Sequence, residues 1–385
     1  MRKVVFITDI PTYHKIPLFN SLTKIMHTNG FGLKVFFLAS GEKRRKWELN
    51  YGNVSFVYEI LGALKVNLSY EWTMFVPISL IGRLNHERPD IIITGGFSLA
   101  TICVLAYCKY KRIPYVIWSG EIPNSSSSQS IYRKKIREIL IRHANSIIVY
   151  GSRAASYIKL LNINKPVFTA YNTSDICFFS EVAINIRRNR KKFLGSLGLS
   201  PVNVNIIYVG GLVRRKGVQF IIKALASLKE QYDFTLHIIG NGVEKDNLQK
   251  QVVSMQLENN VCFWGHKDKT ELAKYYGIGD IFVFPTLHDV WGLVLNEAMA
   301  AGLPVIASKF AGATYDLIEN GNNGFIVDPS DISEMQSKIK MLLNNHRLRK
   351  RMGENAQKTI ISKYTAQNTA LVFLDCLSYA IRAQT

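Results

Sequence analysis

The chain has 385 residues, of which 48% are hydrophobic, and its formal net charge is +20. This length exceeds what one ordinary hydrophobic core needs, and this composition excludes a disordered chain, so we expect two folded domains. Residues 1–180 hold 23 Lys and Arg against 10 Asp and Glu, and such a basic surface favours an anionic partner: nucleic acid, lipid headgroups or a phosphorylated substrate. The five Cys are scattered without a CxxC pair, which argues against disulfides and a zinc site and for a cytoplasmic protein.

The chain starts with an apolar run that predicts a β-strand over Val4–Ile7 and is too short for the core of a signal peptide. Further β-branched runs predict strands, in chain order, at Leu33–Leu38, Ile91–Thr94, Tyr115–Trp118, Ser146–Tyr150 and Val167–Ala170. The uncharged stretch 91–108 approaches the ~18 residues of a minimal membrane span. Because Gly95 and Gly96 divide it into a strand and a helix from about Ser98, we expect a soluble protein.

Three basic clusters accompany these elements, at residues 43–46, 133–137 and 187–192. Each is either a solvated face or a contact surface. The apolar segment Trp72–Gly82 predicts a helix that either packs in the core or, with the nearby basic clusters, rests on lipid. The segment Asn124–Ser130 contains four consecutive Ser, a composition that predicts a loop, and we expect this loop to border the ligand-binding cleft.

The second half repeats the alternation of strands and helices. Its predicted strands are Asn205–Val209, Thr235–Ile239, Val261–Trp264, Ile281–Phe284, Val305–Ala307 and Gly324–Val327, with helices at Gln219–Lys229 and Ile332–Leu343. This pattern implies two doubly wound parallel sheets with ligand sites at the carboxyl ends of their strands. A polar, basic stretch around residues 175–200 marks the boundary. We therefore divide the chain into an N-terminal domain (1–185), a C-terminal domain (186–365) and a C-terminal helix (366–385) that returns to the N-terminal domain.

Two carboxylates stand eight positions apart in "DVWGLVLNEAMAAGLPVIAS", namely Asp289 and Glu297. We expect a loop followed by a helix from near Val294, which places Glu297 in the first turn. Both carboxylates and the free N–H groups of Gly292, Leu293 and Val294 would then face the space above the strand ends, where the helix dipole favours an anion. A nucleotide sugar offers hydroxyls to the carboxylates and phosphate to the amides. Acids that only stabilise a helix start are the alternative.

Cations at the start of another helix form the second pattern. In "YVGGLVRRKGVQFIIKAL" a strand is followed by the turn Gly210-Gly211, and Arg215 and Lys216 precede a helix. Cations there oppose the helix dipole at a cost of a few tenths of a kcal/mol or more, which is tolerated when an anion lies between the positive elements. Arg215 would clamp a diphosphate by bidentate hydrogen bonds and Lys216 as a point charge. A solvated basic turn is the alternative.

Five stretches, in this order and spacing, closely resemble the C-terminal half of family 4 glycosyltransferases. They are "GGLVRRKGV", "GNGVEKDNL", "VCFWGHKDKTELAKYYGIGDIFVFPT", "DVWGLVLNEAMAAGLPVIAS" and "GATYDLIENGNNGFIVDPSD". The resemblance is strong over about residues 200–345, and it extends more weakly into the first half through "ANSIIVYGSRAASYIKLLNI" and "YNTSD". It implies a GT-B fold of two facing Rossmann-like domains and a retaining enzyme with a nucleotide-sugar donor. We expect a UDP-sugar, no cofactor and no metal.

The resemblance also implies roles for residues of both patterns. Glu297 would bind the ribose hydroxyls, and Asp289 would contact the transferred sugar with help from the N–H groups near Gly292–Val294. Arg215 and Lys216 would neutralise the leaving diphosphate.

Strand ends would form the rest of the donor site. The resemblance places Gly240, Gly265 and His266 around the base, and Gly210 and Gly211 at the turn beside the donor.

Two departures from the family pattern affect the donor site. The first acid is usually Glu and is here Asp289, one methylene shorter, so the identity of the sugar stays open. Many members have Arg where this chain has Gly211, and we expect Arg215 and Lys216 to supply that charge.

The first half should bind the acceptor. After "YVIW" comes Ser119-Gly120-Glu121, where many relatives have a His, so Glu121 is our candidate for an acceptor-contacting group, with helix capping as the alternative. His14 either contacts the acceptor or is structural, and His143 is expected to be an ordinary helix-terminal residue.

The sequence therefore predicts a metal-independent, retaining hexosyltransferase. It would move sugar from a nucleotide-diphosphate sugar to a hydroxyl of a lipid-linked glycan, in polysaccharide biosynthesis. Its partners would be the donor, a glycan or polyprenyl-diphosphate-linked acceptor and an anionic membrane surface on the inner face of the plasma membrane. A nucleotide-sugar 2-epimerase of the same fold and a basic nucleic-acid-binding protein are the alternatives.

Overall fold

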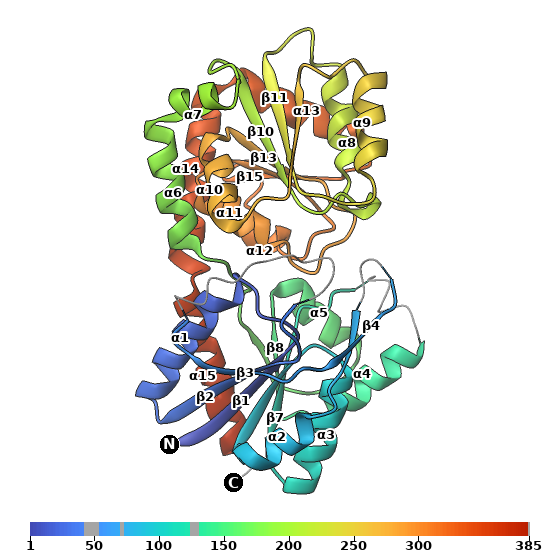
Figure 1. Ribbon diagram of the computed structural model, residues 1–385, viewed down its shortest axis with the longest axis vertical. Helices are drawn as coiled ribbons and strands as arrows, with labels where there is room; N and C mark the ends of the chain where they lie inside the picture. Colours follow the sequence, from blue (N-terminus) through green and yellow to red (C-terminus); the bar gives the residue numbers. More distant parts are fainter. Residues whose placement is uncertain (42–53, 70–72, 124–130, 384–385) are drawn as a thin grey trace. The chain divides into compact units, whose positions relative to one another are not determined.

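The structure, a computed structural model, describes residues 1–41, 54–69, 73–123 and 131–383. The chain divides into two units, Met1–Ser174 with Ala366–Thr385 and Asp175–Thr365. Each unit is a parallel β-sheet covered by helices on both faces (Figure 1), which confirms the predicted class of two doubly wound α/β domains. The basic cluster 43–46, Trp72 and the segment 124–130 lie outside the described residues.

The first unit contains a seven-stranded parallel sheet among its described residues. Its strands are β1 (Arg2–Thr8), β2 (Phe31–Phe37), β3 (Val57–Ile60), β6 (Ile91–Gly95), β7 (Tyr115–Ser119), β8 (Ser146–Val149) and β9 (Val167–Thr169). Their order in the sheet is β3-β2-β1-β6-β7-β8-β9, so the winding direction reverses between β1 and β6. In such sheets, ligands bind beyond the carboxyl ends of the strands at this reversal.

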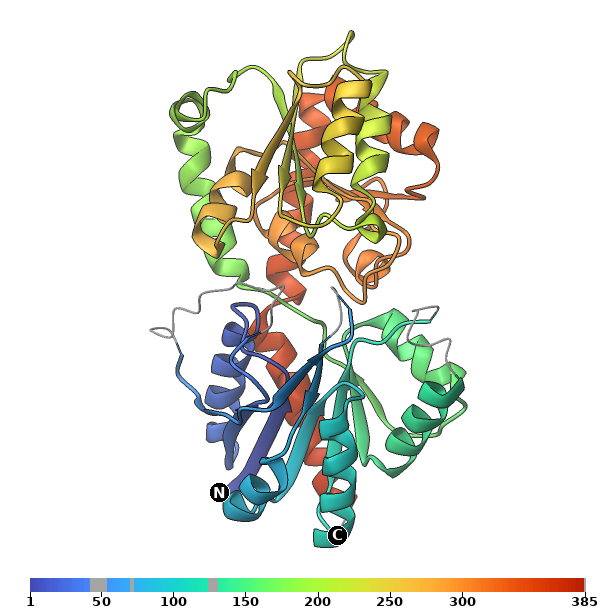
Figure 2. The same cartoon turned by 45° about the vertical axis from the view of Figure 1, so that its right-hand side comes forward.

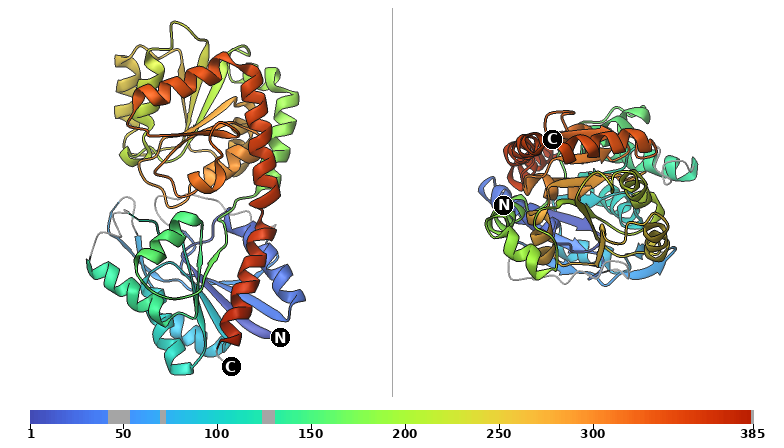
Figure 3. Two further views of the ribbon diagram at one scale, coloured as in Figure 1. Left: turned by 180° about the vertical axis from the view of Figure 1, so that it is seen from behind. Right: turned by 90° about the horizontal axis from the view of Figure 1, so that it is seen from above.

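Helices from both ends of the sequence cover the sheet of the first unit. Helices α1 (Lys15–Thr28) and α15 (Ala366–Arg382) pack on one face, around a core that includes Phe6, Phe19 and Phe373. Figure 3 shows α15 running along this sheet. The other face is covered by α2 (Leu80–Glu87), α3 (Leu99–Lys111), α4 (Ile131–His143) and α5 (Ser152–Leu160).

The uncharged stretch 91–108 forms β6 and most of α3, as predicted from its two Gly. Among the residues that the structure describes, no helix has both the length and the apolar character that a membrane span requires.

The stretch before α2 differs from the sequence prediction. Strand β3 extends the sheet at its edge, and β4 (Leu64–Asn67) pairs antiparallel with β5 (Thr73–Val76). The predicted helix over Trp72–Gly82 is therefore wrong over residues 73–79 and right over residues 80–82, because the segment before Pro77 is extended and α2 begins only at Leu80. The side chains of β3 and β4 are mostly exposed, so no buried alternation marked these strands.

The second unit contains a six-stranded parallel sheet. Its strands are β10 (Val204–Val209), β11 (Phe234–Ile239), β12 (Val261–Gly265), β13 (Ile281–Phe284), β14 (Val305–Ser308) and β15 (Gly324–Val327). All six correspond to predicted strands. The order β12-β11-β10-β13-β14-β15 places the reversal between β10 and β13, so the carboxyl ends of these two strands define the expected ligand edge.

Helices also cover both faces of the second sheet. One face packs against α8 (Val218–Ala226), α9 (Lys245–Ser254) and α13 (Ile332–Asn344). The opposite side carries α6 (Ile176–Arg188), α7 (Arg190–Ser196), α10 (Lys269–Ile278) and α11 (Leu293–Ala300), and Figures 1 and 2 show α8 and α9 across the sheet from α6 and α10. Helix α14 (His346–Lys363) contacts both α13 and α6, and α12 (Thr314–Leu317) follows β14.

The division between the units falls after Ser174. Our sequence boundary between residues 185 and 186 instead cuts α6, which packs against α10 and α11 of the second unit. The basic residues that suggested the boundary start in the last turn of α6, at Arg187 and Arg188. The change in composition therefore falls inside the helix and does not mark the end of a unit.

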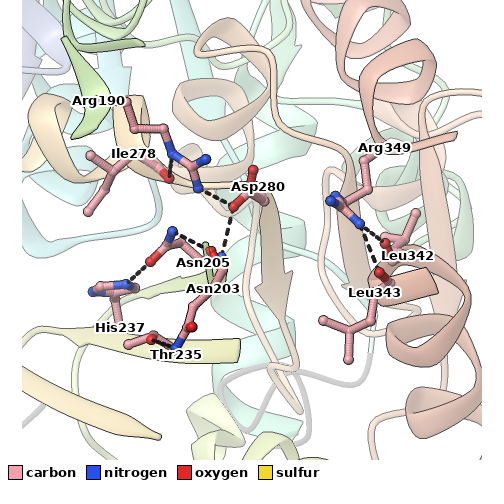
Figure 4. Close-up of polar contacts among 10 residues, drawn as sticks. All are labelled: Arg190, Asn203, Asn205, Thr235, His237, Ile278, Asp280, Leu342, Leu343 and Arg349. Carbon is pink, nitrogen blue, oxygen red and sulfur yellow. Dashed lines mark hydrogen bonds and ion pairs between the residues drawn. The ribbon is translucent and has the colours of Figure 1, made fainter. Parts of the chain in front are cut away.

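A buried polar network occupies the amino edge of the second sheet (Figure 4). The Asp280 carboxylate pairs with Arg190 and accepts a hydrogen bond from the Asn205 N–H at 2.8 Å. His237 joins through Nε2 to Asn205 Oδ1 at 2.8 Å, while its Nδ1 accepts from Trp264 Nε1 at 3.0 Å. Both ring nitrogens are thus used by a neutral imidazole, and burial, with Arg190 nearby, lowers the pKa of His237 to about 3.

Candidate active site

Two loops meet at the carboxyl ends of β10 and β13. The first carries the short helical turn Arg214–Lys216, and the second follows β13. Leu287 N–H donates to the Arg215 carbonyl at 2.7 Å, and Arg215 Nη1 donates to the His288 carbonyl at 3.0 Å. These bonds in both directions hold the cationic turn against the loop that contains Asp289.

Lys216 and Asp289 form an ion pair at this junction, with only 15% and 17% of their side chains exposed. The ammonium also lies over the Phe284 ring, 5.4 Å from its centroid. The other carboxylate oxygen of Asp289 accepts from the Trp291 N–H at 3.4 Å. The structure therefore brings together the members of the two sequence patterns that were separated by 73 positions.

The surroundings of Asp289 favour its ionised form. Burial acts to raise the pKa of this carboxyl, but the charge and hydrogen bond of Lys216 lower it, and Arg215 and the Trp291 N–H add to the lowering. The net result is a pKa below the ordinary 3.8. Asp289 is therefore a carboxylate at neutral pH, able to accept hydrogen bonds from hydroxyl groups.

Two glycines set the path of these loops. Gly217 has φ +74°, and a Cβ there would stand 2.0 Å from the Pro285 carbonyl oxygen. Gly292 has φ +98°, precedes α11, and its Cβ would stand 2.7 Å from the Phe284 ring. Only glycine fits both the backbone conformation and the space. The chain can therefore turn sharply and present the first N–H groups of α11, including Leu293 and Val294, at the ligand edge.

Glu297 lies in a different setting from the one we expected. Helix α11 begins at Leu293, so Glu297 is in its second turn, and its side chain has no exposed surface. Its Oε2 accepts a hydrogen bond from the Tyr276 hydroxyl of α10 at 3.0 Å. We expected both acids to face open space, whereas Glu297 is fully buried, with the Tyr276 hydroxyl as one of its partners. Tyr276 was not singled out from sequence, since the contact joins two helices.

The glycines predicted for the base pocket gather at the ends of three strands. A Cβ on Gly240, which has φ +141°, would stand 1.9 Å from the Gly210 carbonyl oxygen, and the Gly240 N–H donates to the Gly265 carbonyl at 2.8 Å. Asn241 lies beside them: a Cβ on Gly211 or Gly265 would come within 3.9 and 3.6 Å of its atoms. Asn241 is a residue that the motif "GNGVEKDNL" contains but that we had given no role.

His266 follows β12 and is exposed. It therefore stands at the same edge as Gly265, with a side chain accessible to a ligand.

In the first unit, Glu121 is held by a buried arginine. Arg137 of α4 approaches the Glu121 carboxylate at 3.4 Å and donates from Nη1 to the Tyr157 hydroxyl at 3.0 Å. Its guanidinium also lies 5.5 Å from the Phe97 ring. Arg137 belongs to the basic cluster 133–137, so one member of that cluster is an internal partner and not a solvated charge. Glu121 follows β7, at the carboxyl edge of the sheet.

His14 and its neighbour Lys15 lie at the end of the loop after β1. His14 Nδ1 is 3.4 Å from Ser174 Oγ. Lys15 pairs with Asp9 and donates to Thr8 Oγ1 at 2.8 Å. Lys15 lies at the reversal point of this sheet, and the sequence analysis gave it no role because its partners Thr8 and Asp9 form no motif with it.

The fold matches that of a solved structure. The structure of Anabaena HepE in complex with UDP-glucose matches with a TM-score of 0.76 over 98% of this chain and 100% of that chain, at 20% identity. Both have the two Rossmann-like domains of GT-B glycosyltransferases.

Sequence comparison identifies the family. The model for glycosyl transferases group 1 matches residues 190–359. The capsular polysaccharide biosynthesis glycosyltransferase CapM of Staphylococcus aureus is 32% identical over 75% of this chain and 77% of its own length. The uncharacterized glycosyltransferase MJ1607 of Methanocaldococcus jannaschii is 28% identical over 78% of both chains. The chain belongs to the group 1 glycosyltransferases, the family 4 enzymes that its motifs resemble.

Proposed function

We propose that the enzyme transfers a hexose-type sugar, with retention, from a UDP-sugar to a hydroxyl of a lipid-linked glycan. The acceptor oxygen forms a bond to the anomeric carbon on the face from which the diphosphate leaves. The bond between that carbon and the diphosphate oxygen breaks, and the leaving phosphate takes the proton of the acceptor hydroxyl. The protein needs to supply charge stabilisation and positioning, without a nucleophile of its own.

The observation that carries this proposal is the contact of Arg215 and Lys216 with the loop that leads into α11, at the strand reversal. Both cations are tied to the loop between β13 and α11. The negative charge of a diphosphate leaving group would be stabilised there by the two side chains and by the N–H groups that begin α11. An arginine and a lysine that are already positioned lose little side-chain freedom when the phosphate binds.

Asp289 and Glu297 have separate roles in the proposal. Asp289, ionised and partly exposed, accepts hydrogen bonds from hydroxyls of the transferred sugar. Glu297 accepts from the ribose hydroxyls while the Tyr276 hydroxyl fixes its carboxylate. Because Glu297 is fully buried, side chains around it, such as Tyr276, must move for the ribose to reach its carboxylate.

A uridine nucleotide is supported by the structural neighbour HepE, which binds UDP-glucose. We assign the base to the strand ends at Gly240, Gly265 and His266, with Asn241 as an additional amide that can donate and accept. Gly210 and Gly211 allow the backbone to approach the nucleotide closely.

The acceptor side of the proposal is supported by a relative and by the charge of the chain. The relative CapM is named for capsular polysaccharide biosynthesis, and a glycan carried on polyprenyl diphosphate at the inner face of the plasma membrane suits a protein with net charge +20. We assign acceptor contact to Glu121, whose carboxylate Arg137 holds in place.

The donor site can be tested with thermal shift and activity measurements over UDP-, GDP- and ADP-sugars. We expect stabilisation by UDP-sugars, and its loss in Lys216→Ala and Glu297→Gln. Lys250→Ala, an exposed cation on α9 of the same unit, is the matched control and should bind as the wild type does. Unchanged donor binding and transfer in Lys216→Ala would refute the assignment.

Incubating donor without acceptor separates transfer from epimerisation. A transferase leaves the sugar of the donor unchanged apart from slow hydrolysis, whereas a 2-epimerase converts it. Family membership sets aside the non-enzymatic, nucleic-acid-binding alternative.

A further inference from the structure

Helix α4 of the first unit presents apolar side chains to solvent. Tyr132 is 82% exposed, Ile131 70% and Ile139 52%, and Ile136 is exposed as well. They recur at intervals of three and four residues, so Tyr132, Ile136 and Ile139 follow one side of the helix. The opposite side, with Arg137, Leu140 and Ile141, is buried in the unit. Isolated exposed side chains of this size are ordinary, but a stripe along one helix calls for a partner.

Cations are interleaved with this stripe. Lys135 and Arg142 are exposed, and they lie on the same side of the helix as Ile139, because the three positions are separated by four and three residues. Residues 96–174 as a whole contain eleven Lys and Arg against two Glu, and Glu121, one of those two, is already paired with the buried Arg137. Glu138, the other of the two, lies on α4 itself, so the outer side of α4 is apolar and net positive.

Helix α3, next to α4, also carries exposed apolar and basic side chains. It contacts α4, and Figures 1 and 2 show the two helices as neighbours. Its outer side carries Ile102 and Tyr110, both exposed, with Lys109 and Lys111 at its end. Tyrosines with an apolar ring and a polar hydroxyl, next to lysines, are suited to the boundary between water and lipid.

From these observations we infer that the outer side of α3 and α4 is an interfacial surface that binds an anionic membrane. The isoleucines enter the headgroup boundary, while Lys135, Arg142 and the cations of α3 contact the lipid phosphates. A second copy of this chain is disfavoured, because a symmetric contact would set these cations against themselves. Nucleic acid is disfavoured because the exposed isoleucines of the stripe neither stack on bases nor contact phosphates and would stay in water.

The inference deepens the proposed function by naming the surface that brings the enzyme to a lipid-linked acceptor, but vesicle binding can be measured without any transfer. The full-length protein is sedimented with vesicles of phosphatidylcholine, with or without phosphatidylglycerol. We expect it to bind the anionic vesicles and to leave the neutral ones. Failure of the wild type to bind anionic vesicles would overturn the inference, as would α4-dependent binding to duplex DNA in its place.

Two double variants separate the apolar from the charged contribution. Tyr132→Ser with Ile139→Ser removes the stripe and keeps the charge, and Lys135→Gln with Arg142→Gln does the reverse. We expect each to weaken partitioning by about tenfold or more. The substituted side chains are exposed, so the melting temperature should stay near that of the wild type, which the same samples check.

The matched control is Lys191→Gln with Lys192→Gln on α7 of the second unit, where two exposed cations lack an apolar stripe. It should bind vesicles as the wild type does. An equal loss in this control would show that net charge alone drives binding and would overturn the assignment to α4. Concentration-dependent dimerisation abolished by the Tyr132 and Ile139 substitutions would identify a second copy as the partner and overturn it too.

Transfer to a water-soluble acceptor gives the independent readout. We expect both α4 variants to keep wild-type rates there, so loss of vesicle binding is distinct from a failed active site. If the wild type binds vesicles through α4 but transfers no sugar from any UDP-sugar, the proposed function fails and the surface assignment stands.

Discussion

At the scale of single residues, the ion pair between Lys216 and Asp289 is the part of the site with the clearest chemical consequence. Burial alone would favour a neutral carboxyl, and Lys216, more than Arg215 or the Trp291 N–H, reverses that tendency. A substrate diphosphate that binds Lys216 therefore also changes the electrostatic environment of the Asp289 carboxylate. The two ends of the donor, phosphate and sugar, are coupled through one side-chain contact.

Replacing Lys216 with Met tests that coupling. In the wild type the pKa of Asp289 lies below 3.8, so the stability it contributes is present above pH 3.8 and is lost as pH falls through the lower folded value. In Lys216→Met, burial dominates and the pKa of Asp289 should rise. Carboxyl-carbon NMR titration of Asp289 measures it, with Lys250→Met as the control that leaves the titration unchanged. An unaltered Asp289 titration in Lys216→Met would show that the pair does not set its charge.

Tyr276→Phe removes the hydroxyl that donates to the buried Glu297. The carboxylate then loses a hydrogen bond without gaining water, and we expect the free energy of unfolding to fall by about 1–3 kcal/mol. Urea unfolding gives this value. Tyr275→Phe, one residue away on α10 and in ring contact with Trp264, should change it by much less. Equal effects of the two substitutions would argue against the hydrogen bond to Glu297.

Sequence reasoning located Arg215 and Lys216 because cations at a helix start oppose the helix dipole, and it located Asp289 because this acid stands with Glu297 beside a predicted helix start. It could not find Tyr276 or Asn241, since their importance comes from contacts between elements distant in the chain. Sequence reasoning also expected the Glu297 side chain to face open space, whereas it is fully buried. The helix start was predicted to within one residue, but the burial of Glu297 comes from contacts with other elements, such as that with Tyr276, which no local pattern shows.

At the scale of elements, the strands were predictable wherever both faces are buried. All six strands of the second sheet and six of the first appear as short β-branched runs in the sequence. Strands β3, β4 and β5 were missed because they lie at an edge or in a hairpin, where exposed side chains carry no buried pattern. Pro77, a local signal, should have argued against the helix predicted over Trp72–Gly82.

The turn at Gly217 allows a prediction about an element. Gly217→Ala combines a left-handed backbone with a Cβ that would stand 2.0 Å from the Pro285 carbonyl oxygen. We expect a loss of about 2–4 kcal/mol in unfolding free energy and weaker UDP binding, because Arg215 and Lys216 move with the turn. Gly321→Ala is the matched control: φ is +84° but nothing lies within 4 Å of the new Cβ, so about 1 kcal/mol is expected. Calorimetry with and without UDP measures both, and equal losses would exclude the contact with Pro285.

At the scale of the whole molecule, each unit has its own sheet and its own hydrophobic core, with the C-terminal helix α15 completing the first. The presence of two parallel sheets, one after the other along the chain, was predictable from the alternation of strands and helices. The position where one unit ends was not, because α6 belongs by packing to the second unit and that contact has no signature in composition.

The neutral His237 makes global stability depend on pH. Its pKa is about 3 in the folded chain against 6.5 for an ordinary histidine. Below pH 6.5 the unfolded chain is therefore protonated at this histidine, while the folded chain keeps it neutral. The free energy of unfolding falls as the pH drops, by about 1.4 kcal/mol per pH unit from this residue. The difference in pH slope between wild type and His237→Gln, measured by urea unfolding from about pH 7 to pH 5, should show this loss. A His237→Gln variant with the same slope as the wild type would contradict the assignment.

The central claim is that one donor diphosphate is held between the cationic turn of Arg215 and Lys216 and the start of α11. A crystal structure with bound UDP tests it most directly. The account predicts phosphate oxygens within hydrogen-bond distance of Arg215, Lys216 and the N–H groups of Gly292–Val294. Density for UDP at another place, with this edge of the second sheet empty, would contradict it.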